Sequence, residues 1–423
     1  GILQDGRRIN VILDGIIPYF EIQLPDNEST HQNTIDKILD ILNKDEKTIP
    51  INTKIISARP FKGYKQTCTK FLRLYYSKDK KFRTNAIQII RDNGYITTSD
   101  DLTNYYLAVC RDYLITFGSW STLTDYVLTK ESSIKGITYK VNINNFKPYT
   151  TELVDDLLKD KTLSCCWDIE TWSPSGGVPL PTNPNDNIFC ISMTFQWVNE
   201  KEPFLKVCLC DFPACPNPDY ITIVCGNEKN ILKGFSEIFG MMTPYFIFGF
   251  NDSDYDWNWV IKRGQYYKGL LTYMANKMDN TIPYIPYTDD GIYTWNFRKT
   301  TVKLEAGIGV DGFSLMLKGY IPGDVRTIFR KIYKNPEISS LKYFLELNKL
   351  SSKEDMPIPV MFKIYSNYRD FINKHKENYK DVFDGKTYEL DINSWTNEDI
   401  KLYNNFKKKL TDINYYCIID AQR

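Results

Sequence analysis

The stretch CWDIETW, residues 166–172, decides how the second half of this chain folds. It alternates between apolar side chains such as Ile169 and the carboxylates of Asp168 and Glu170. Successive side chains of a β-strand point to opposite faces of a sheet, so a strand at residues 162–170 would carry both carboxylates on one face. Carboxylate oxygens are the ligands that hard divalent cations prefer. The stretch therefore predicts a strand that supplies half of a metal site.

Two further acidic segments follow later in the sequence. The apolar stretch TPYFIFGFN, residues 243–251, predicts a strand that leads into the start of a helix with Asp256. Near the end of the chain, Tyr416 precedes Asp420 by four residues, which places both side chains on one face of a predicted helix. Carboxylates from three such segments can hold two cations about 3.5–4 Å apart, the arrangement found in two-metal nucleases.

This set of residues, in this order, resembles the three exonuclease motifs of the family B DNA polymerases, whose proofreading domain belongs to the DEDD superfamily. GFNDSDYDWNWVIKR resembles the second motif, and YYCIIDAQR resembles the third. The resemblance implies a ribonuclease-H-like exonuclease domain. It also implies that Phe250, Asn251 and Tyr255 contact the DNA strand.

The resemblance assigns roles to the acidic residues as well. Asp168 would bridge two divalent cations, Mg²⁺ or Mn²⁺, while Glu170 and Asp420 would complete the site that holds the attacking water. Asp256 would act on the second cation. The hydroxyl of Tyr416 would orient the water rather than take its proton, because a phenol has a pKa of about 10. Packing of the Tyr416 ring against the sheet is the alternative.

Other segments extend the resemblance over most of the chain. They are GIIPYFEIQLP, RDYLITFGSW, and IPGDVRTIF followed by ISSLKYFLELNKLSSKEDMP. The sequence is most similar in character to the polymerases of large nucleocytoplasmic DNA viruses of the African swine fever virus type.

The family's nucleotidyl-transfer motifs, of the types Ser-Leu-Tyr-Pro-Ser, Lys-x-x-x-Asn-Ser-x-Tyr-Gly and Tyr-Gly-Asp-Thr-Asp-Ser, do not occur in this sequence. The chain also stops at Arg423, inside a predicted helix, so we expect a fragment of a longer polymerase. Its expected partners are single-stranded 3′ ends, primer–template DNA, and the palm, fingers and thumb of the parent. We expect a monomer, located at a cytoplasmic viral replication site or in the host nucleus and not secreted.

Composition sets further bounds. A chain of 423 residues with 42% hydrophobic residues can form two or three domains. No apolar run approaches the roughly 18 residues that span a bilayer, and no signal peptide opens the sequence. The ten cysteines lack the spacing of a disulfide framework, which predicts reduced thiols. Four of them invite a zinc interpretation, but their spacing matches no standard zinc pattern. These are Cys208, Cys210, Cys215 and Cys225.

The net charge is only +1, yet residues 1–150 hold 21 Lys and Arg against 16 Asp and Glu. Within them, the stretch at residues 62–83 interleaves basic and aromatic side chains. Such a mixture can contact DNA phosphates and stack on bases. The alternation favours the other interpretation, a half-buried hairpin with a charged turn at residues 77–81.

The pattern as a whole predicts an α+β N-terminal domain at residues 1–150 and a mixed α/β exonuclease domain at residues 151–423. In the first domain we expect a strand pair around the turn at residues 14–15 and two amphipathic helices, at residues 33–44 and 84–95. The second domain is expected to begin with strands at 162–170, 188–198, 204–211, 220–225 and 245–250, with a helix at 227–240. Residues 264–305 are expected to form a connection with a short hairpin around residues 289–291.

Three functions are compatible with these residues. The first is a metal-dependent 3′–5′ proofreading exonuclease that releases nucleoside monophosphates from single-stranded or mismatched DNA ends. A free-standing DEDD exonuclease acting on RNA is the second, and the acids alone do not separate it from the first. The third is a non-catalytic DNA-binding scaffold, against which the complete set of acids argues.

Overall fold

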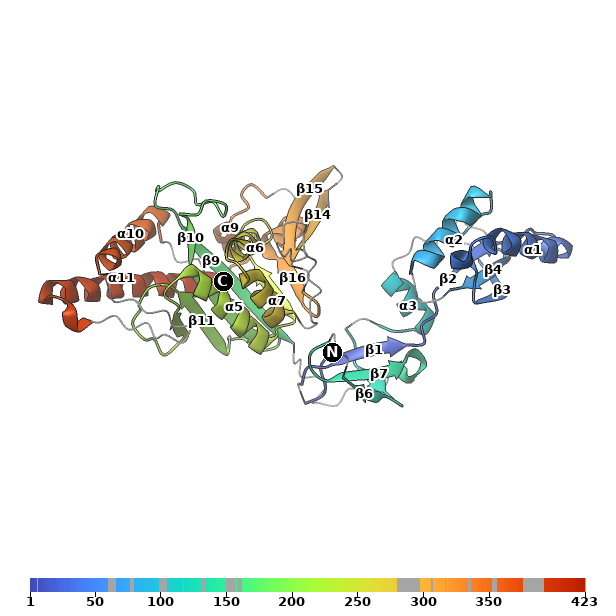
Figure 1. The fold of residues 1–423 in the computed structure, drawn as a ribbon, viewed down its shortest axis with the longest axis horizontal. Helices are drawn as coiled ribbons and strands as arrows, with labels where there is room; N and C mark the ends of the chain where they lie inside the picture. Colours follow the sequence, from blue (N-terminus) through green and yellow to red (C-terminus); the bar gives the residue numbers. More distant parts are fainter. Residues whose placement is uncertain are drawn as a thin grey trace. The chain divides into compact units, whose positions relative to one another are not determined.

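The chain forms two compact units, residues 1–131 with 136–157, and residues 132–135 with 158–423 (Figure 1). The structure, a computed structural model, describes residues 1–5, 7–59, 66–76, 80–98, 105–116, 118–130, 134–149, 157, 162–279, 297–305, 307–315, 317–333, 336–351, 356–375 and 392–422.

The first unit combines small sheets with the helices α1, α2 and α3. One sheet has the order β2-β4-β3 and is antiparallel, another has the order β1-β7-β6, and β5 pairs with β8. The apolar faces of α1 and α2 share one core with β2 and β4, as the 3.6-residue spacing of Ile35, Ile38 and Leu42 predicts. The elements are β1 (Asn10–Asp14), β2 (Tyr19–Gln23), α1 (His31–Leu42), β3 (Asn52–Ala58), β4 (Thr69–Tyr75), α2 (Lys80–Asp92), α3 (Tyr105–Tyr113), β5 (Ser121–Leu123), β6 (Val127–Thr129), β7 (Thr138–Asn142) and β8 (Phe146–Pro148).

The predicted strand pair around residues 14–15 is wrong. Both strands exist, but β1 pairs in parallel with β7, and β2 pairs with β4. Gly15 has a φ of 80°, and a Cβ atom there would lie 2.6 Å from the side-chain amide of Asn142. The chain therefore turns tightly against β7 and passes into a different sheet. Within that sheet β2 is an edge strand, as the preceding Pro18 predicts.

The hairpin predicted in residues 62–83 is also wrong. Residues 69–75 of this stretch form a half-buried strand, β4, but β4 lies between β2 and β3 rather than beside a strand from the same stretch. Lys80 already begins α2, and residues 77–79 lie outside the described residues. Arg73, one of the basic residues of the stretch, pairs with Glu21 of β2 at 2.6 Å.

The second unit is built on a six-stranded mixed sheet of order β12-β11-β10-β9-β13-β16. Strands β9, β10 and β11 are antiparallel neighbours, whereas β12, β13 and β16 each join in parallel. The predicted strands and the helix after them are confirmed with ends shifted by a few residues. They are β9 (Leu163–Trp172), β10 (Asn187–Trp197), β11 (Leu205–Cys210), β12 (Ile221–Val224), α5 (Glu228–Met242), β13 (Phe246–Gly249) and α6 (Asp256–Tyr266).

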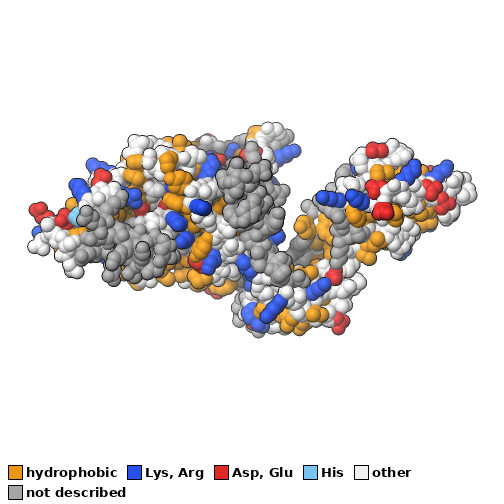
Figure 2. Space-filling view, viewed as in Figure 1, with side chains coloured by type: hydrophobic (Ala, Val, Ile, Leu, Met, Phe, Trp, Pro, Cys, Tyr) orange, Lys and Arg blue, Asp and Glu red, His pale blue; other side chains and the backbone are white. Residues whose placement is uncertain are grey.

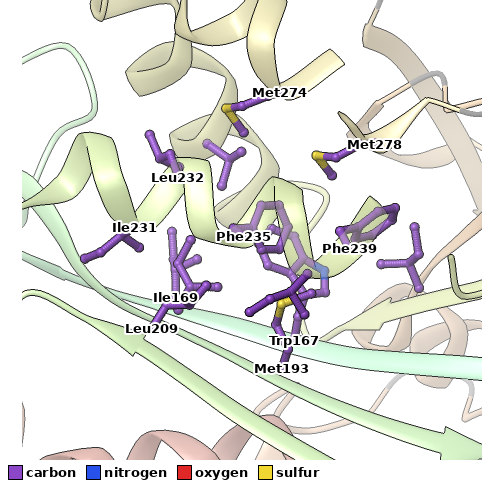
Figure 3. Packing of buried hydrophobic residues seen from close by; sticks show 14 of the residues in the cluster. Trp167, Ile169, Met193, Leu209, Ile231, Leu232, Phe235, Phe239, Met274 and Met278 are labelled. Carbon is purple, nitrogen blue, oxygen red and sulfur yellow. The ribbon is translucent and has the colours of Figure 1, made fainter. Parts of the chain in front are cut away.

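Helices cover both faces of this sheet. On one face, apolar side chains of the sheet pack against α5, α6 and α7; Figure 3 shows Trp167 and Met193 beneath Phe235 and Phe239. On the other face, α11 crosses β9, β10 and β11 and packs against α10. The strict alternation of β9 is what lets it contribute to both layers, because its odd-numbered side chains enter the first core.

The region after α6 departs from expectation. Residues 264–305, predicted as a connection, contain the helix α7 (Leu270–Met278), whose Leu270, Leu271 and Met274 are buried against α5 and α6. The hairpin predicted around residues 289–291 lies outside the described residues. The remaining elements are β14 (Phe297–Glu305), β15 (Ile308–Leu315), β16 (Ile321–Asp324), α8 (Val325–Ile332), α9 (Leu341–Leu347), α10 (Ile358–Lys374) and α11 (Asn397–Gln422).

All ten cysteines are free, as predicted. Among the described helices, none combines the length and the apolarity that a bilayer span requires.

A buried ion pair fastens α6 to α5. The guanidinium of Arg263 donates to the carboxylate of Glu228 at 2.6–3.0 Å, and both side chains are at most 3% exposed. The same carboxylate accepts from the backbone N–H of Ile188 on β10 and from the hydroxyl of Tyr267. One buried carboxylate thus ties two helices to the sheet.

We predict that Arg263→Leu lowers the free energy of unfolding by about 3–5 kcal/mol, because it leaves the Glu228 carboxylate buried without its counter-charge. The matched control is Lys277→Leu, which breaks a pair with Glu237 whose side chains are 42% and 33% exposed. That change should cost less than about 1 kcal/mol. Chemical denaturation measures both values, and equal losses would contradict the role given to the buried pair.

Candidate active site

Strand β9 presents two carboxylates beneath α11. Asp168 lies opposite Ser192 of β10, and Glu170 lies opposite Cys190, so both carboxylates occupy the sheet face that carries the second helical layer. Ile169, which lies between them in the sequence, and Trp167 before them belong to the opposite core. The period-two pattern that predicts this strand therefore also produces the arrangement of the acids.

The helix α11 brings in the third carboxylate from 250 positions further along the chain. Oxygens of Asp168, Glu170 and Asp420 all lie within 4.8 Å of one another, and the three side chains are half-buried. Buried residues such as Ile413 and Cys417 hold α11 against the sheet. Among the described residues this is the cluster whose ligand atoms are close enough to share a metal ion.

Asp256 lies beside this cluster and is almost fully buried. It is the first residue of α6, and its Oδ1 accepts the backbone N–H of Ile169 at 3.2 Å. Strand β13 pairs with β9 only as far as Cys166, so this carboxylate takes the place of a strand partner further along β9. Burial, and then the negative charge of Asp168, raise the pKa of Asp256 well above its usual range.

Tyr416 faces the same cluster, one helical turn before Asp420. Its hydroxyl donates to Oδ2 of Asp420 at 3.2 Å. Burial raises its pKa, and the charges of Glu170 and Asp420 raise it further, so the phenol stays protonated at neutral pH. The adjacent Tyr415 is 44% exposed, which separates the two tyrosines of the motif.

The carboxylates line an open cleft of about 950 Å³. Residues from the loop after β9, the loop before α6, and α10 form its walls. The predicted DNA-binding residues Phe250, Asn251 and Tyr255 all line it. The hydroxyl of Tyr255 is 2.6 Å from the hydroxyl of Thr171 at the end of β9, which ties the second motif to the first.

The loop before α6 contains two further acids, which we interpret from the sequence as turn and cap residues. Asp254 is exposed and lies in a turn. Asp252 is different, because its buried Oδ2 accepts the indole N–H groups of Trp167 and Trp257 at 3.3 and 3.1 Å. Burial raises the pKa of Asp252 to about 8, with a further contribution from Asp324. The side chain of Asp252 therefore stabilises the core through the two tryptophans and does not cap α6.

Sequence reasoning missed Asp324 and Arg326, which hold the same loop from outside the cleft. Oδ1 of Asp324 accepts the backbone N–H of Asn251 at 3.0 Å, and its Oδ2 accepts the hydroxyl of Ser253. Arg326 donates to Oδ1 of Asn251 at 2.7 Å. The only local signal was an Asp at the N-cap of a helix, which indicates a helix start and says nothing of a contact more than 70 residues away.

Comparison with known families matches residues 100–320, just over half of the chain, to the exonuclease domain of DNA polymerase family B. The chain belongs to this family. Tyr416 and Asp420 lie beyond the matched residues, and in the fold they stand beside Asp168 and Glu170. The family and the ribonuclease-H-like fold class that the motifs predict are therefore confirmed.

Comparison with individual proteins supports the same family. The DNA polymerase beta of African swine fever virus (isolate Tick/Malawi/Lil 20-1/1983) is 30% identical over all of this chain, which spans 31% of that relative's length. The DNA polymerase of Paramecium bursaria Chlorella virus NY2A is 30% identical over 22% of the chain. The fold also matches the family B DNA polymerase of Pyrobaculum calidifontis with a TM-score of 0.52 at 14% identity, over 86% of this chain and 39% of the archaeal one.

The family B acids of this chain fit a divalent cation. The donors are hard carboxylate oxygens from β9 and α11, gathered within bonding range of one centre. Asp256 adds a fourth carboxylate, whose pKa is raised by burial and by the negative charge of Asp168. The chain has two histidines, His31 and His375, and neither belongs to this cluster. The residues present therefore favour a hard metal with oxygen ligands over a soft one.

We predict that Mn²⁺ or Mg²⁺ raises the melting temperature of the chain, because a ligand that binds only the folded state at 100 times its Kd stabilises it by about 2.7 kcal/mol. The shift should disappear in Asp420→Asn and persist in Asp254→Asn, an exposed acid of the neighbouring loop. Differential scanning fluorimetry with and without EDTA measures the effect. An unchanged shift in Asp420→Asn would remove this residue from the metal site.

Proposed function

We propose that this chain is a metal-dependent 3′–5′ exonuclease that removes nucleoside monophosphates from the 3′ ends of DNA. One observation carries the proposal, the convergence of Asp168, Glu170 and Asp420 at the floor of a cleft, with Asp256 beside them. The family B exonuclease match supports the same activity. A non-catalytic scaffold would have no need for this costly concentration of negative charge.

The protein's own residues have distinct roles in the proposal. Asp168, Glu170 and Asp420 would hold one cation, and Asp168 with Asp256 a second. Cations bound there would activate water and neutralise the charge that develops on the phosphate. Tyr416 remains a neutral hydrogen-bond donor, so its hydroxyl can orient the attacking water but does not act as the base. Mg²⁺ and Mn²⁺ are the ions we propose.

The substrate we propose is a single-stranded or mismatched 3′ end. A terminal nucleotide has to leave its base pair to enter the cleft, which costs a few kcal/mol for a matched pair and less for a mismatch. Phe250, Tyr255 and Asn251 would contact this strand. The charged side chains on the visible face of each unit are of both signs and interspersed (Figure 2). We assign DNA recognition to the cleft because Phe250, Asn251 and Tyr255 line it.

We further propose that the chain works as the proofreading part of a DNA polymerase, with palm, fingers and thumb supplied by the rest of the parent protein. The chain spans 31% of the viral relative that it matches along its whole length, and that relative is a DNA polymerase. A replication site in the infected cell is the location that this role implies, and a monomer is the proposed state.

The test is digestion of a 5′-labelled oligonucleotide by the 423-residue chain. We predict stepwise shortening with Mg²⁺ or Mn²⁺ and none with EDTA. Asp168→Ala combined with Glu170→Ala should leave under about 1% of the activity, a loss of at least ~2.7 kcal/mol of barrier lowering. Asp254→Asn is the matched control and should digest normally.

The outcomes separate the competing functions. Normal digestion by a folded double variant would refute the site, and no digestion by the unaltered chain with either metal would favour the scaffold. Matched DNA and RNA oligonucleotides distinguish a DNA proofreading enzyme from an RNA exonuclease.

Removing only the hydroxyl of Tyr416 tests its role. Tyr416→Phe keeps the ring packing, and we predict a 10- to 1,000-fold fall in rate, because one hydrogen bond in a transition state contributes a few kcal/mol at most. Metal-induced stabilisation should survive. Tyr415→Phe, on the exposed side of the same helix turn, should leave the rate unchanged. An unaltered rate in Tyr416→Phe would return this residue to a packing role.

A further inference from the structure

Asn251 has an unusual backbone conformation at the edge of the cleft. Its φ is 67°, in the left-handed region that few residues other than glycine and asparagine enter. It lies between the end of β13 and the start of α6, and its carbonyl accepts the N–H groups of Asp254 and Tyr255. Asn251 is thus the corner residue of the loop that delivers Tyr255 and Asp256 to the site.

Two residues of another segment fix this corner. Asp324, which pairs with Gly249 at the end of β16, accepts the backbone N–H of Asn251 and also caps α8 through the N–H of Arg326 at 2.9 Å. Arg326 donates through one terminal nitrogen to Oδ1 of Asn251 at 2.7 Å. The backbone and the side chain of Asn251 are therefore held separately by two adjacent elements.

The guanidinium of Arg326 is itself fixed on its other side. Its Nε donates to the carbonyl of Ser339 at 3.1 Å, and its second terminal nitrogen donates to the hydroxyl of Ser339 at the same distance. All three guanidinium nitrogens therefore have defined partners. Arg326 does not line the cleft, so its effect on a substrate has to pass through Asn251.

Arg326 determines the orientation of the side-chain amide of Asn251. A guanidinium has only hydrogen-bond donors and keeps its proton in proteins, so it can contact only the oxygen of a neighbouring amide. The oxygen of Asn251 is used by Arg326, and the NH₂ group is the part of the amide left for the cleft. An amide that could flip would present either its oxygen or its NH₂ group to the substrate, whereas the contact with Arg326 keeps the oxygen of Asn251 turned toward the guanidinium.

We propose that Arg326 is a positioning residue that fixes Asn251 as a hydrogen-bond donor to the substrate strand. The acceptor is an oxygen near the 3′ end, either the terminal 3′-hydroxyl or the phosphate next to the scissile one. This inference rests on the proposed exonuclease function. It adds a residue outside the cleft, and it sets the chemical sense of the contact made by Asn251.

The experiment measures kcat and KM on three single-stranded DNA substrates: unmodified, ending in a dideoxynucleotide, and carrying a methylphosphonate next to the scissile linkage. In the unaltered chain, one of the two modifications should lower kcat/KM about 10- to 100-fold, the range for one hydrogen bond with a charged or strongly polar partner. That result identifies which oxygen accepts.

The variants test the positioning. Asn251→Asp keeps an acceptor for Arg326 but has no NH₂ group, and Arg326→Met keeps the aliphatic stem but has no donors. Both should raise KM more than they lower kcat, and both should lose the sensitivity to the modified substrate. The double variant should be no worse than the poorer single variant, because the two residues act in series. Arg330→Met, on the same helix, is the control with unchanged kinetics.

Several results would overturn the proposal. They are a wild-type chain indifferent to both modifications, an Arg326→Met variant with full sensitivity to the modification, or additive losses in the double variant. If Arg326→Met fails to fold, Arg326→Lys replaces it, and it should retain one donor and show an intermediate KM; a KM equal to that of the unaltered chain would again count against positioning. Absence of digestion of the unmodified strand would instead refute the proposed function itself.

Discussion

Electrostatic repulsion among the clustered carboxylates is the main constraint that the fold of the second unit has to satisfy. Three of them lie within 4.8 Å, and a fourth, Asp256, is buried beside Asp168. Two unit charges 4 Å apart at an effective dielectric constant of 20 repel each other by about 4 kcal/mol. The raised pKa of Asp256 relieves part of this repulsion by favouring its neutral form, and cations bound at the cluster would relieve it further.

The surrounding structure is arranged to withstand that repulsion. Asp168 and Glu170 cannot move apart, because they lie on an inner strand of a six-stranded sheet and both positions pair with β10. Asp256 is held by the N–H of Ile169, and the helix that carries it is fastened by the ion pair of Arg263 with Glu228. The helix α11, which carries Asp420, is held against the sheet by apolar packing and by a hydrogen bond from the side-chain amide of Asn414 to the hydroxyl of Thr222 on β12 at 3.0 Å. The carboxylates are therefore held by different elements of the fold, β9, α6 and α11.

Local patterns in the sequence predict much of this, and distant pairings do not. The alternation around Asp168 fixes a strand and its two faces, and the four-residue spacing of Tyr416 and Asp420 fixes a helix face. Neither prediction requires knowing which strand or helix packs against the segment. The parallel pairing of β1 with β7 could not be predicted, because the turn at Gly15 suggested a hairpin. The contact that shows otherwise is with Asn142, which is distant in the sequence. Arg326 was missed for the same reason, since its meaning depends on Asn251, 75 residues away.

The carboxylates come from distant positions in the sequence, and bringing them together has an entropic cost. Asp168 and Asp420 are separated by most of the second unit, and closing so long a loop costs entropy that only the completed sheet and its helices can offset. The packing of the apolar faces of this sheet and its helices is therefore what holds the carboxylates together. Because α11 supplies both Asp420 and Tyr416, any loosening of this helix would remove a proposed metal ligand and the hydroxyl that we propose to orient the water. The apolar contacts beneath α11 are thus as much a part of the proposed chemistry as the acids themselves.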